Sequence, residues 1–325
     1  MLKARNPSDN ETQEGTLPAA ALFEQISCPL CEDGEFDVVR ACRHPPTVSE
    51  NDLRECYSAS SNHILLDQVV RCRSCSLQYV NPRPRAEVII ESYAGAVDPT
   101  FVAQNEERIR TFTQTLRQVM RRVSLASGKG KRLVDVGCAG GACPAAARAL
   151  GFDVVGVEPS RWMADYGRRT HGLDIREGLL VPGMFPPASL DFLTLWDVLE
   201  HVPDPHQLLT LAAELLKPGG VLAVTYPDVG SLCARLMGER WPFWLSVHLL
   251  YYDRKTMRRQ LERADLEVVS QAPYNPTLQL GYILQRGAPY FPPAGLMARM
   301  VNAVGLGRLR VSYNMGQTLA VCLKR

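Results

Sequence analysis

Two carboxylates and an imidazole lie within five positions in the stretch TLWDVLEHVPDP, directly after a run of apolar residues. They are Asp197, Glu200 and His201, which would share one face of a helix or turn that began at Asp197. Three interpretations compete. His201 could act as a general base that a carboxylate orients, or all three residues could bind a divalent cation. Alternatively, the acids favour a helix N-terminus while His201 only packs.

A second candidate for catalysis is His248, in the stretch RWPFWLSVHLLYYD. Aromatic side chains lie on both sides of it in the sequence: Trp241, Phe243, Trp244, Tyr251 and Tyr252. Such a density of rings predicts either the wall of a substrate pocket or an aromatic cluster in the core.

Two C-x-x-C pairs, CPLC and CRSC, supply four thiols in the N-terminal part of the chain. This spacing lets two thiolates on a tight turn reach one zinc ion, and two pairs complete a closed tetrahedral site. We therefore predict structural zinc with four ligands: Cys28, Cys31, Cys72 and Cys75. The 40 residues between the pairs hold further candidate ligands, namely Cys42, His44, Cys56 and His63.

The length of 325 residues predicts two domains, and a composition of 46% hydrophobic and 22% charged residues is that of a globular protein. Residues 1–25 are polar and lack the apolar core of a secretory signal, so they predict a disordered tail. No run of about 18 apolar residues predicts a membrane span. Ten cysteines without an export signal indicate reduced thiols and a cytoplasmic location.

Charge along the chain bears on possible partners. Between Cys28 and Val80 five arginines face eight acids, whereas a phosphate-binding module should be basic, so a nucleic-acid partner is disfavoured. No acid follows Glu267. Within the resulting basic segment, residues 289–310, one helical face gathers apolar side chains: Leu296, Met297, Met300, Val301 and Val304. This face predicts either packing on its own domain or peripheral contact with a membrane.

The elements that must position these groups are predicted from residues that end helices and strands and from the periodicity of apolar residues. NPRP ends a zinc-ribbon-like module over residues 26–85, and a helical linker over 86–130 includes a helix at about 105–125. Strands and helices then alternate from residue 131 to 325, with an insertion at about 275–312. Alternation of this kind predicts a doubly wound parallel sheet, which binds ligands at the carboxyl ends of its strands.

A glycine turn follows the first of these strands in LVDVGCAGG, and Glu158 comes about 20 residues later. Both a dinucleotide and another adenosine ligand need a backbone that they can approach closely and a carboxylate that binds the ribose hydroxyls. The dinucleotide pattern fails because Cys138 and Ala139 follow Gly137. Asp135 in the first strand and the acidic cluster after the fourth favour S-adenosylmethionine.

Four ordered motifs carry a family resemblance: LVDVGCAGG, VVGVEPS, LDFLTLWDVLEHVPDP and LLKPGGVLAVTYP. Over residues 132–270 the chain resembles class I S-adenosylmethionine-dependent methyltransferases. CPLC, CRSC and NPRP resemble the zinc-ribbon extension of one bacterial branch, although Ser76 stands where that branch usually has glycine. The resemblance implies an α/β fold: a doubly wound, mostly parallel Rossmann-like sheet with a small N-terminal zinc-binding module.

The resemblance also implies cofactor-binding residues. The turn around the methionine part of the cofactor would be shaped by Asp135, Gly137, Ala139 and Gly141. Glu158 would hold both ribose hydroxyls, and the stretch from Glu177 through Leu179 to Leu180 would frame the adenine. Trp196 ends its strand at the edge of the cofactor. The D-x-x-E-H pattern resembles the E-x-x-E-H of some metal-dependent methyltransferases that act on hydroxyls.

Together these features predict a methyltransferase for a small-molecule acceptor, with the methyl group placed on a hydroxyl of a sugar, a lipid-linked intermediate or a secondary metabolite. One alternative is an RNA methyltransferase that reads its substrate through the zinc ribbon. Another is a non-catalytic scaffold that only binds the cofactor. The sequence leaves the oligomeric state open.

Overall fold

The computed structural model describes the chain except for residues 1–16, 19–21, 45–46, 59–62, 96 and 289–290. The predicted disordered tail, residues 1–25, lies mostly outside the described residues. Its described part includes a short strand, β2 (Phe23–Glu24), which pairs with β7 (Arg83–Pro84). An ion pair of 2.9 Å between Arg83 and Glu24 accompanies this pairing, so here the chain differs from the predicted tail.

A seven-stranded sheet in the order β10-β9-β8-β11-β12-β17-β14 forms the centre of the fold. Its strands are β8 (Arg132–Val136), β9 (Asp153–Glu158), β10 (Ile175–Glu177), β11 (Leu190–Trp196), β12 (Leu216–Pro227), β14 (Leu266–Pro273) and β17 (Gln317–Lys324). The first five positions pair in parallel, and β17 is antiparallel to both of its neighbours. The predicted doubly wound, mostly parallel sheet is therefore confirmed.

Helices cover both faces of this sheet. Between residues 98 and 263 the helices are α4 (Pro99–Val102), α5 (Asn105–Arg122), α6 (Ala142–Ala149), α7 (Arg161–His171), α8 (Pro205–Leu215), α9 (Leu232–Met237), η1 (Gly238–Arg240) and α10 (Arg254–Glu262). Leu116 and Val119 of α5 share one buried cluster with Ala146 of α6. Leu209 of α8 and Met257 of α10 belong to another cluster. Successive side chains of a strand point to opposite faces of the sheet, so the strands contribute residues to both clusters.

Capping residues set the ends of the helices that flank the site. Ser160 accepts a hydrogen bond from the backbone of Met163 at the start of α7, and Gly172 ends this helix in the left-handed region. Asp204 caps α8, and Pro205 occupies its first position, where a missing N–H costs little. The predicted helix over 105–125 is confirmed as α5, three residues shorter at its C-terminal end.

The N-terminal module contains a four-stranded antiparallel sheet in the order β13-β6-β5-β3. Its strands are β3 (Phe36–Arg40), β5 (Val69–Cys72), β6 (Gln78–Val80) and β13 (Leu250–Tyr251), while β1 (Leu17–Pro18), β4 (Thr47–Val48), α2 (Glu50–Cys56) and α3 (Ala86–Ala94) complete the N-terminal region. Strand β13 comes from the far side of the sequence. The module is therefore joined by backbone hydrogen bonds to the segment that carries His248.

The predicted insertion near the C-terminus forms β15 (Thr277–Gln279), α11 (Leu280–Gly287), α12 (Pro293–Ala303), η2 (Leu306–Arg308) and β16 (Arg310–Ser312). Helix α12 buries its small residues, Ala294 and Ala298. Its larger apolar side chains stay exposed: Leu296 at 63%, Met297 at 45%, Met300 at 60% and, just beyond the helix, Val304 at 70%. Within the part of the chain that the structure describes, most of this apolar face therefore has no cover, although Val301 is half-buried.

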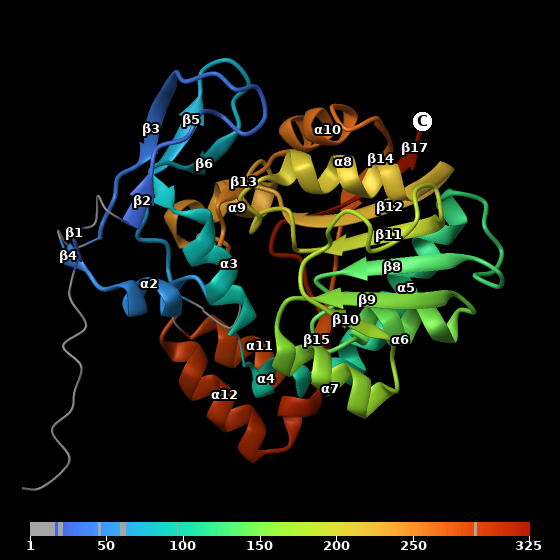
Figure 1. Cartoon of the computed structure of the whole chain (residues 1–325). Coiled ribbons are helices and arrows are strands. Elements are labelled where there is room, and N and C mark those ends of the chain that lie inside the picture. The colour runs from blue at the N-terminus through green and yellow to red at the C-terminus, as the bar shows by residue number, and fades with distance from the viewer. Residues whose placement is uncertain (1–16, 19–21, 45–46, 59–62, 96, 289–290) are drawn as a thin grey trace, which may run out of the picture.

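Figure 1 shows the parallel strands with their arrowheads turned toward α3, α11 and the N-terminal module. Ligands of parallel sheets bind at this edge, so these segments are placed to enclose a site. Among the described residues, no helix combines the length and apolar character that crossing a bilayer would require.

Candidate functional site

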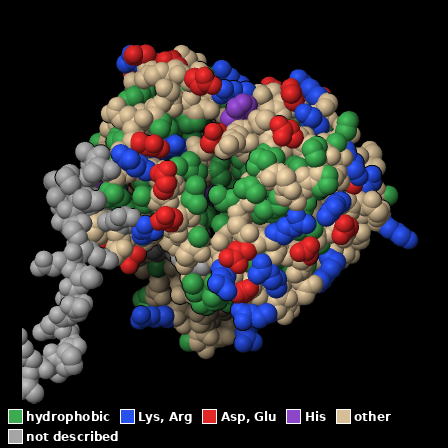
Figure 2. Space-filling model, viewed as in Figure 1, with side chains coloured by type: hydrophobic (Ala, Val, Ile, Leu, Met, Phe, Trp, Pro, Cys, Tyr) green, Lys and Arg blue, Asp and Glu red, His purple; other side chains and the backbone are tan. Residues whose placement is uncertain are grey.

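A cavity of about 1240 Å³ lies at the carboxyl ends of the parallel strands. Strands β8, β9 and β11 supply its floor, while α3, α5, α11 and the loop before β13 supply its walls. Hydrophobic side chains gather around a hollow between the N-terminal module and the sheet (Figure 2). The cavity joins the predicted cofactor residues to both predicted histidines.

The turn after β8 contains a position where the backbone lies too close to a neighbouring residue for a side chain to fit. Gly137 adopts a φ of 69°, and a Cβ added there would lie 2.8 Å from Cγ2 of Val198. Ala139 also lies in the left-handed region, with a φ of 46°, which explains why glycine suits this position. Gly141 does not line the cavity: it begins α6 and packs closely against Leu173.

Asp135 is buried where β8 reaches this turn. Its Oδ1 accepts a hydrogen bond of 2.6 Å from the Thr194 hydroxyl, while Oδ2 is buried without a partner among the described residues. Burial raises the pKa of this carboxyl to about 7. A polar atom left open at the cavity wall is suited to a ligand that donates a hydrogen bond.

Glu158 ends β9 on the opposite side of the turn. Its two carboxylate oxygens accept backbone hydrogen bonds of 2.7 Å from Ala139 and 2.8 Å from Ser160. Burial raises the pKa of this carboxyl to about 7, although both hydrogen bonds favour the ionised form. The side chain is therefore fixed in orientation and faces the cavity.

The predicted adenine-framing stretch lies partly at the cavity. Leu179 and Leu180 line it, whereas the side chain of Glu177 is exposed and does not. Glu177 is the last residue of β10, and its side chain points to solvent because burial falls along this strand from Ile175 onward. Only the backbone of Glu177 remains available for the predicted role.

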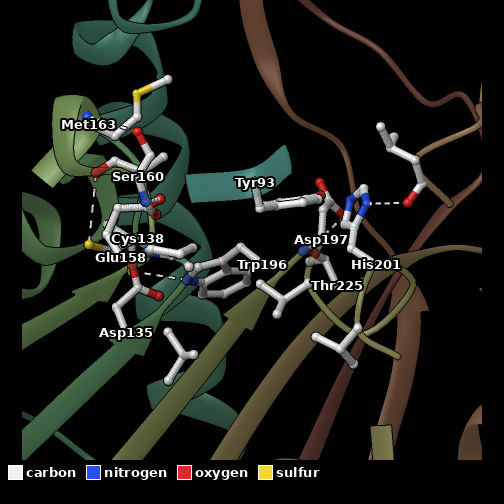
Figure 3. Close-up of a pocket in the computed structure, with 18 of the residues that line it drawn as sticks. Tyr93, Asp135, Cys138, Glu158, Ser160, Met163, Trp196, Asp197, His201 and Thr225 are labelled. Carbon is white, nitrogen blue, oxygen red and sulfur yellow. Dashed lines mark hydrogen bonds between the residues drawn. The ribbon is translucent and has the colours of Figure 1, made fainter. Parts of the chain in front are cut away.

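Trp196 separates the two ends of the cavity. Its indole Nε1 donates to the Cys143 sulfur at 3.0 Å, and its ring packs against Phe112 with centroids 5.1 Å apart. Figure 3 shows this ring between Asp135 and Glu158 on one side and Asp197 and His201 on the other.

Asp197 does not join Glu200 and His201 on one face. It has a φ of 53°, and the residues that follow form a turn rather than a helix. Its carboxylate accepts hydrogen bonds from the Thr225 hydroxyl at 3.0 Å and from the Gln317 amide at 2.9 Å. The predicted i, i+3, i+4 arrangement is wrong in this respect, because the left-handed residue interrupts the regular geometry.

His248 takes the place that was predicted for Asp197. One nitrogen or oxygen each from Glu200, His201 and His248 lies within 4.8 Å of the others. The two imidazole rings meet edge to face with centroids 4.7 Å apart. Burial lowers the pKa of His201 to about 4 and that of His248 well below its usual value, so both rings are neutral and are weak proton acceptors at neutral pH.

The aromatic stretch around His248 divides between core and pocket. Trp241, Tyr251 and Tyr252 are completely or almost completely buried, and the Trp241 indole donates to the Met315 carbonyl at 2.6 Å. Phe243 lines the cavity. The prediction of a core cluster is therefore confirmed for most of these rings, and that of a pocket wall for Phe243.

The cavity also contains side chains from the segment predicted only as a linker. Tyr93 of α3 approaches the His201 ring edge to face at 5.4 Å. Asn105 donates to the Gly140 carbonyl at 2.9 Å, and Arg108 stacks over Phe101 at 3.7 Å. Asn105, Arg108 and Phe112 are spaced i, i+3 and i+7, so they lie on one face of α5. Polar residues on a helical face that is otherwise apolar were the signal in the sequence that could have identified this part of the site.

The four predicted cysteines form one compact group in the N-terminal module. Their sulfur atoms lie within 4.8 Å of one another, with Cys28 3.4 Å from Cys75 and Cys31 3.4 Å from Cys72. Thiolates about 2.3 Å from one zinc ion are separated by similar distances, so the group fits a closed tetrahedral site. Ser76 adopts a φ of 69°, the region that glycine would enter without strain.

Comparison with known proteins covers the central half of the chain. Residues 105–271 match the family described as methyltransferase domain. The ubiquinone biosynthesis O-methyltransferase of Paraburkholderia phymatum is 35% identical over 97 residues, 28% of this chain and 42% of that protein. The enzyme of the same description from Ralstonia nicotianae is 37% identical over 103 residues, 30% and 43% of the two chains. The match thus spans about two fifths of these relatives.

Among solved structures, an S-adenosylmethionine-dependent methyltransferase from Mesorhizobium loti aligns with a TM-score of 0.44 and 18% identity. The alignment covers 65% of this chain and 96% of that one. The family match extends from α5 to β14 and includes the glycine turn, Glu158 and the stretch from Asp197 to His201. The chain therefore belongs to the methyltransferase domain family.

Proposed function

We propose that the protein transfers a methyl group from S-adenosylmethionine to a hydroxyl of a small-molecule acceptor. One observation carries the proposal: a single cavity joins the glycine turn and Glu158, on one side of Trp196, to two neutral imidazoles on the other. Such a cavity can hold cofactor and acceptor together, out of water, which is what a displacement reaction needs most. The names of the curated relatives, both O-methyltransferases, support oxygen as the acceptor atom.

The residues at the cofactor end fit S-adenosylmethionine. The bound cofactor would supply a methyl group that is already activated by its sulfonium. Gly137 lines the cavity without a side chain, so a ligand can approach its backbone, and the open Oδ2 of Asp135 can accept a hydrogen bond. Glu158, held by two backbone N–H groups, can accept from two ribose hydroxyls. We propose that Leu179 contacts the adenine and that Trp196 separates cofactor from acceptor.

The acceptor would lie between Trp196 and the pair formed by His201 and His248. Rings from α3, α5 and the C-terminal region surround this space, including Tyr93, Phe112 and Tyr274. Walls of this kind support an acceptor with a large apolar part. Of the three predicted acceptor classes, a lipid-linked intermediate or an apolar secondary metabolite fits better than a free sugar.

The chain contributes mainly alignment to the reaction. The acceptor oxygen forms a bond to the methyl carbon, the bond from this carbon to sulfur breaks, and its electron pair stays on sulfur. The hydroxyl proton must leave as well. Because the pKa of His201 is about 4, its imidazole alone provides little driving force for that proton transfer. We assign Asp197 a positioning role, since Thr225 and Gln317 hold its carboxylate.

We also propose that α12 and the residues after it touch an anionic membrane surface. The exposed side chains of Leu296, Met300 and Val304 form the apolar part of this surface. Arg299 and Arg308 supply positive charge, and no acid follows Glu267 in the sequence. Helix α11, which packs against α12, lines the cavity through Tyr282 and Ile283. A lipid-linked acceptor could therefore enter the cavity from such a surface.

Transfer of labelled methyl groups into an extract of the source cell would test the function. After incubation, the extract is separated into lipid, aqueous small-molecule, RNA and protein fractions. We expect label in the lipid or small-molecule fraction, and none with Glu158→Ala. Label in RNA would support an RNA methyltransferase instead. A protein that binds S-adenosylmethionine but labels no fraction would be a non-catalytic scaffold.

A further inference from the structure

The carboxylate of Glu200 is buried without a partner. The residue is 1% exposed, and neither of its oxygens has a hydrogen-bond partner among the described residues. No arginine or lysine of the described chain forms an ion pair with it. A buried carboxylate without a partner is strongly unfavourable, so a compensating ligand is to be expected.

The two neighbours of this carboxylate are imidazoles with a defined orientation. Nδ1 of His201 lies 2.9 Å from the Val247 carbonyl, and Nδ1 of His248 lies 2.8 Å from the Phe243 carbonyl. A carbonyl accepts hydrogen bonds only, so Nδ1 carries the proton in each ring. Each Nε2 is left with a lone pair, which is the usual arrangement of a metal-binding histidine.

We propose that Glu200, His201 and His248 bind one divalent transition-metal ion, which also takes the acceptor oxygen as a ligand. This inference rests on the proposed function and deepens it. Ligand atoms that lie about 2 Å from one ion are about 3 to 4 Å apart, so the observed separations within 4.8 Å need only small side-chain rotations. Three protein ligands leave an open position, as in catalytic zinc sites with two histidines and a glutamate.

Backbone hydrogen bonds hold the two halves of this site together. The carbonyl of Glu200 accepts from the backbone N–H of Leu249 at 2.7 Å and of Leu250 at 3.2 Å. The segment after His248 is therefore attached directly to the turn that carries Glu200. Both histidines line the cavity, so an ion between them would face the acceptor.

The ligand set selects the class of metal. Two imidazole nitrogens and one carboxylate oxygen suit Zn²⁺, Mn²⁺ or Fe²⁺ better than Mg²⁺ or Ca²⁺, which prefer oxygen ligands. The set also differs from the four thiols of the N-terminal module, which favour Zn²⁺. Two metals of different character can therefore be distinguished in one chain.

The ion would resolve the proton problem of the transfer. Coordination lowers the pKa of the acceptor hydroxyl, so its proton leaves to water and the oxygen keeps both electrons. That oxygen then forms the bond to the methyl carbon, and the electron pair of the broken carbon–sulfur bond stays on sulfur. No oxidant or reductant is needed.

Binding of Mn²⁺ to the protein with its cysteine site filled by zinc is the direct test. Electron paramagnetic resonance counts free Mn²⁺, and the thiols bind this metal poorly. We expect one Mn²⁺ per chain, with at least about tenfold weaker binding in Glu200→Gln and in His248→Gln. The matched control is Asp197→Asn, which changes a carboxylate three positions from Glu200 but outside the group, and Mn²⁺ binding should persist.

Three results would overturn the inference: no Mn²⁺ bound, binding that survives Glu200→Gln, or binding lost in Asp197→Asn alone. Retained binding of S-adenosylmethionine shows that each variant is folded. Methyl transfer that continues at full rate after treatment with a chelator would refute the metal while leaving the proposed function intact. Transfer that is absent with every metal, by contrast, would refute the proposed function.

Discussion

Glu158 carries a charge in a buried position, so its protonation should control cofactor binding. Its pKa of about 7 means that the carboxylate is ionised above this pH and protonated below it. Only the ionised form accepts hydrogen bonds with both oxygens, so binding below pH 7 must first release a proton. We predict that the dissociation constant of S-adenosylmethionine rises about tenfold per pH unit below 7.

Titration calorimetry between pH 5.5 and 8.5, values of about one and a half units on either side of this pKa, measures that dependence. Asp135, whose pKa is also about 7, adds a slope of its own. The difference between the wild type and Glu158→Gln therefore isolates Glu158. Asp153→Asn, at the exposed start of the same strand, is the control and should bind like the wild type. Equal slopes in the wild type and Glu158→Gln would contradict the assignment.

Gly137 is constrained both by its backbone and by its neighbour, and a second glycine separates the two effects. Gly130 has a φ of 74° and open space around it, whereas Gly137 has a φ of 69° and Val198 at 2.8 Å from an added Cβ. Gly130→Ala should lose about 1 kcal/mol of unfolding free energy from the left-handed backbone. Gly137→Ala should lose about 1 to 3 kcal/mol more through the clash, and should bind the cofactor more weakly.

Urea unfolding of the two alanine variants, followed by their affinity for S-adenosylmethionine, checks this prediction. Equal losses of stability would mean that Val198 moves aside. In that case the close approach at Gly137 would not shape the cofactor site.

Individual residues were predictable from sequence where a motif fixes both type and position. Asp135, Gly137 and Glu158 lie where the ordered motifs place them, and the four cysteines form one group. The third residue of the group around Glu200 and His201 was not predictable in this way. Spacing suggested Asp197, but the left-handed backbone at that residue directs its carboxylate to Gln317. His248 arrives instead from 48 positions later in the chain.

At the scale of elements, α12 presents large apolar side chains that the described residues of its own chain leave exposed. Burying the Met300 side chain in a bilayer interface would contribute about 1.5 to 3 kcal/mol. We predict that Met300→Glu lowers binding to vesicles with anionic lipid about tenfold or more. The substitution removes the contribution of the buried methionine and adds a negative charge that the anionic lipid repels. Sedimentation with vesicles measures the bound fraction.

The control for that experiment is Val269→Glu, which adds the same charge at an exposed position of β14, away from α12. It should bind vesicles like the wild type. Equal binding by both variants, or no binding by the wild type, would refute a membrane role for α12.

Elements with a strong local signal were predicted almost to the residue. Strand β11 ends at Trp196, where a strand was predicted to end, and the helix predicted over 105–125 is α5, Asn105–Arg122. The environment of α12 was not predicted from the sequence, because periodicity shows which residues share a face and not what lies against that face. The structure buries Ala294 and Ala298 and leaves the larger side chains outside.

The whole molecule assembles its cavity from segments that are far apart in sequence. The proposed cofactor residues come from β8, β9 and β11, whereas the proposed acceptor end adds α3, α11 and the loop before β13. Local patterns predict each of these segments but not their meeting, which depends on tertiary packing and on the pairing of β13 with β6. That pairing connects the N-terminal module to the acceptor end, while Arg263 connects it to the end of α10 through the Leu30 carbonyl at 2.8 Å.

Zinc in the N-terminal module should therefore matter for transfer more than for cofactor binding. The backbone N–H of Val80 in β6 donates to the Leu249 carbonyl at 2.8 Å, one residue after His248. We predict that Cys72→Ser lowers the zinc content from about one ion per chain, keeps the affinity for S-adenosylmethionine within about threefold, and loses methyl transfer by a factor of about 100. Metal analysis, calorimetry and the labelled-methyl assay measure these three quantities.

The control is Cys42→Ser, which replaces an exposed cysteine outside the group and should change none of them. Unchanged zinc in Cys72→Ser would remove the zinc site, and loss of cofactor binding together with transfer would mean that the module supports the entire sheet rather than the acceptor end.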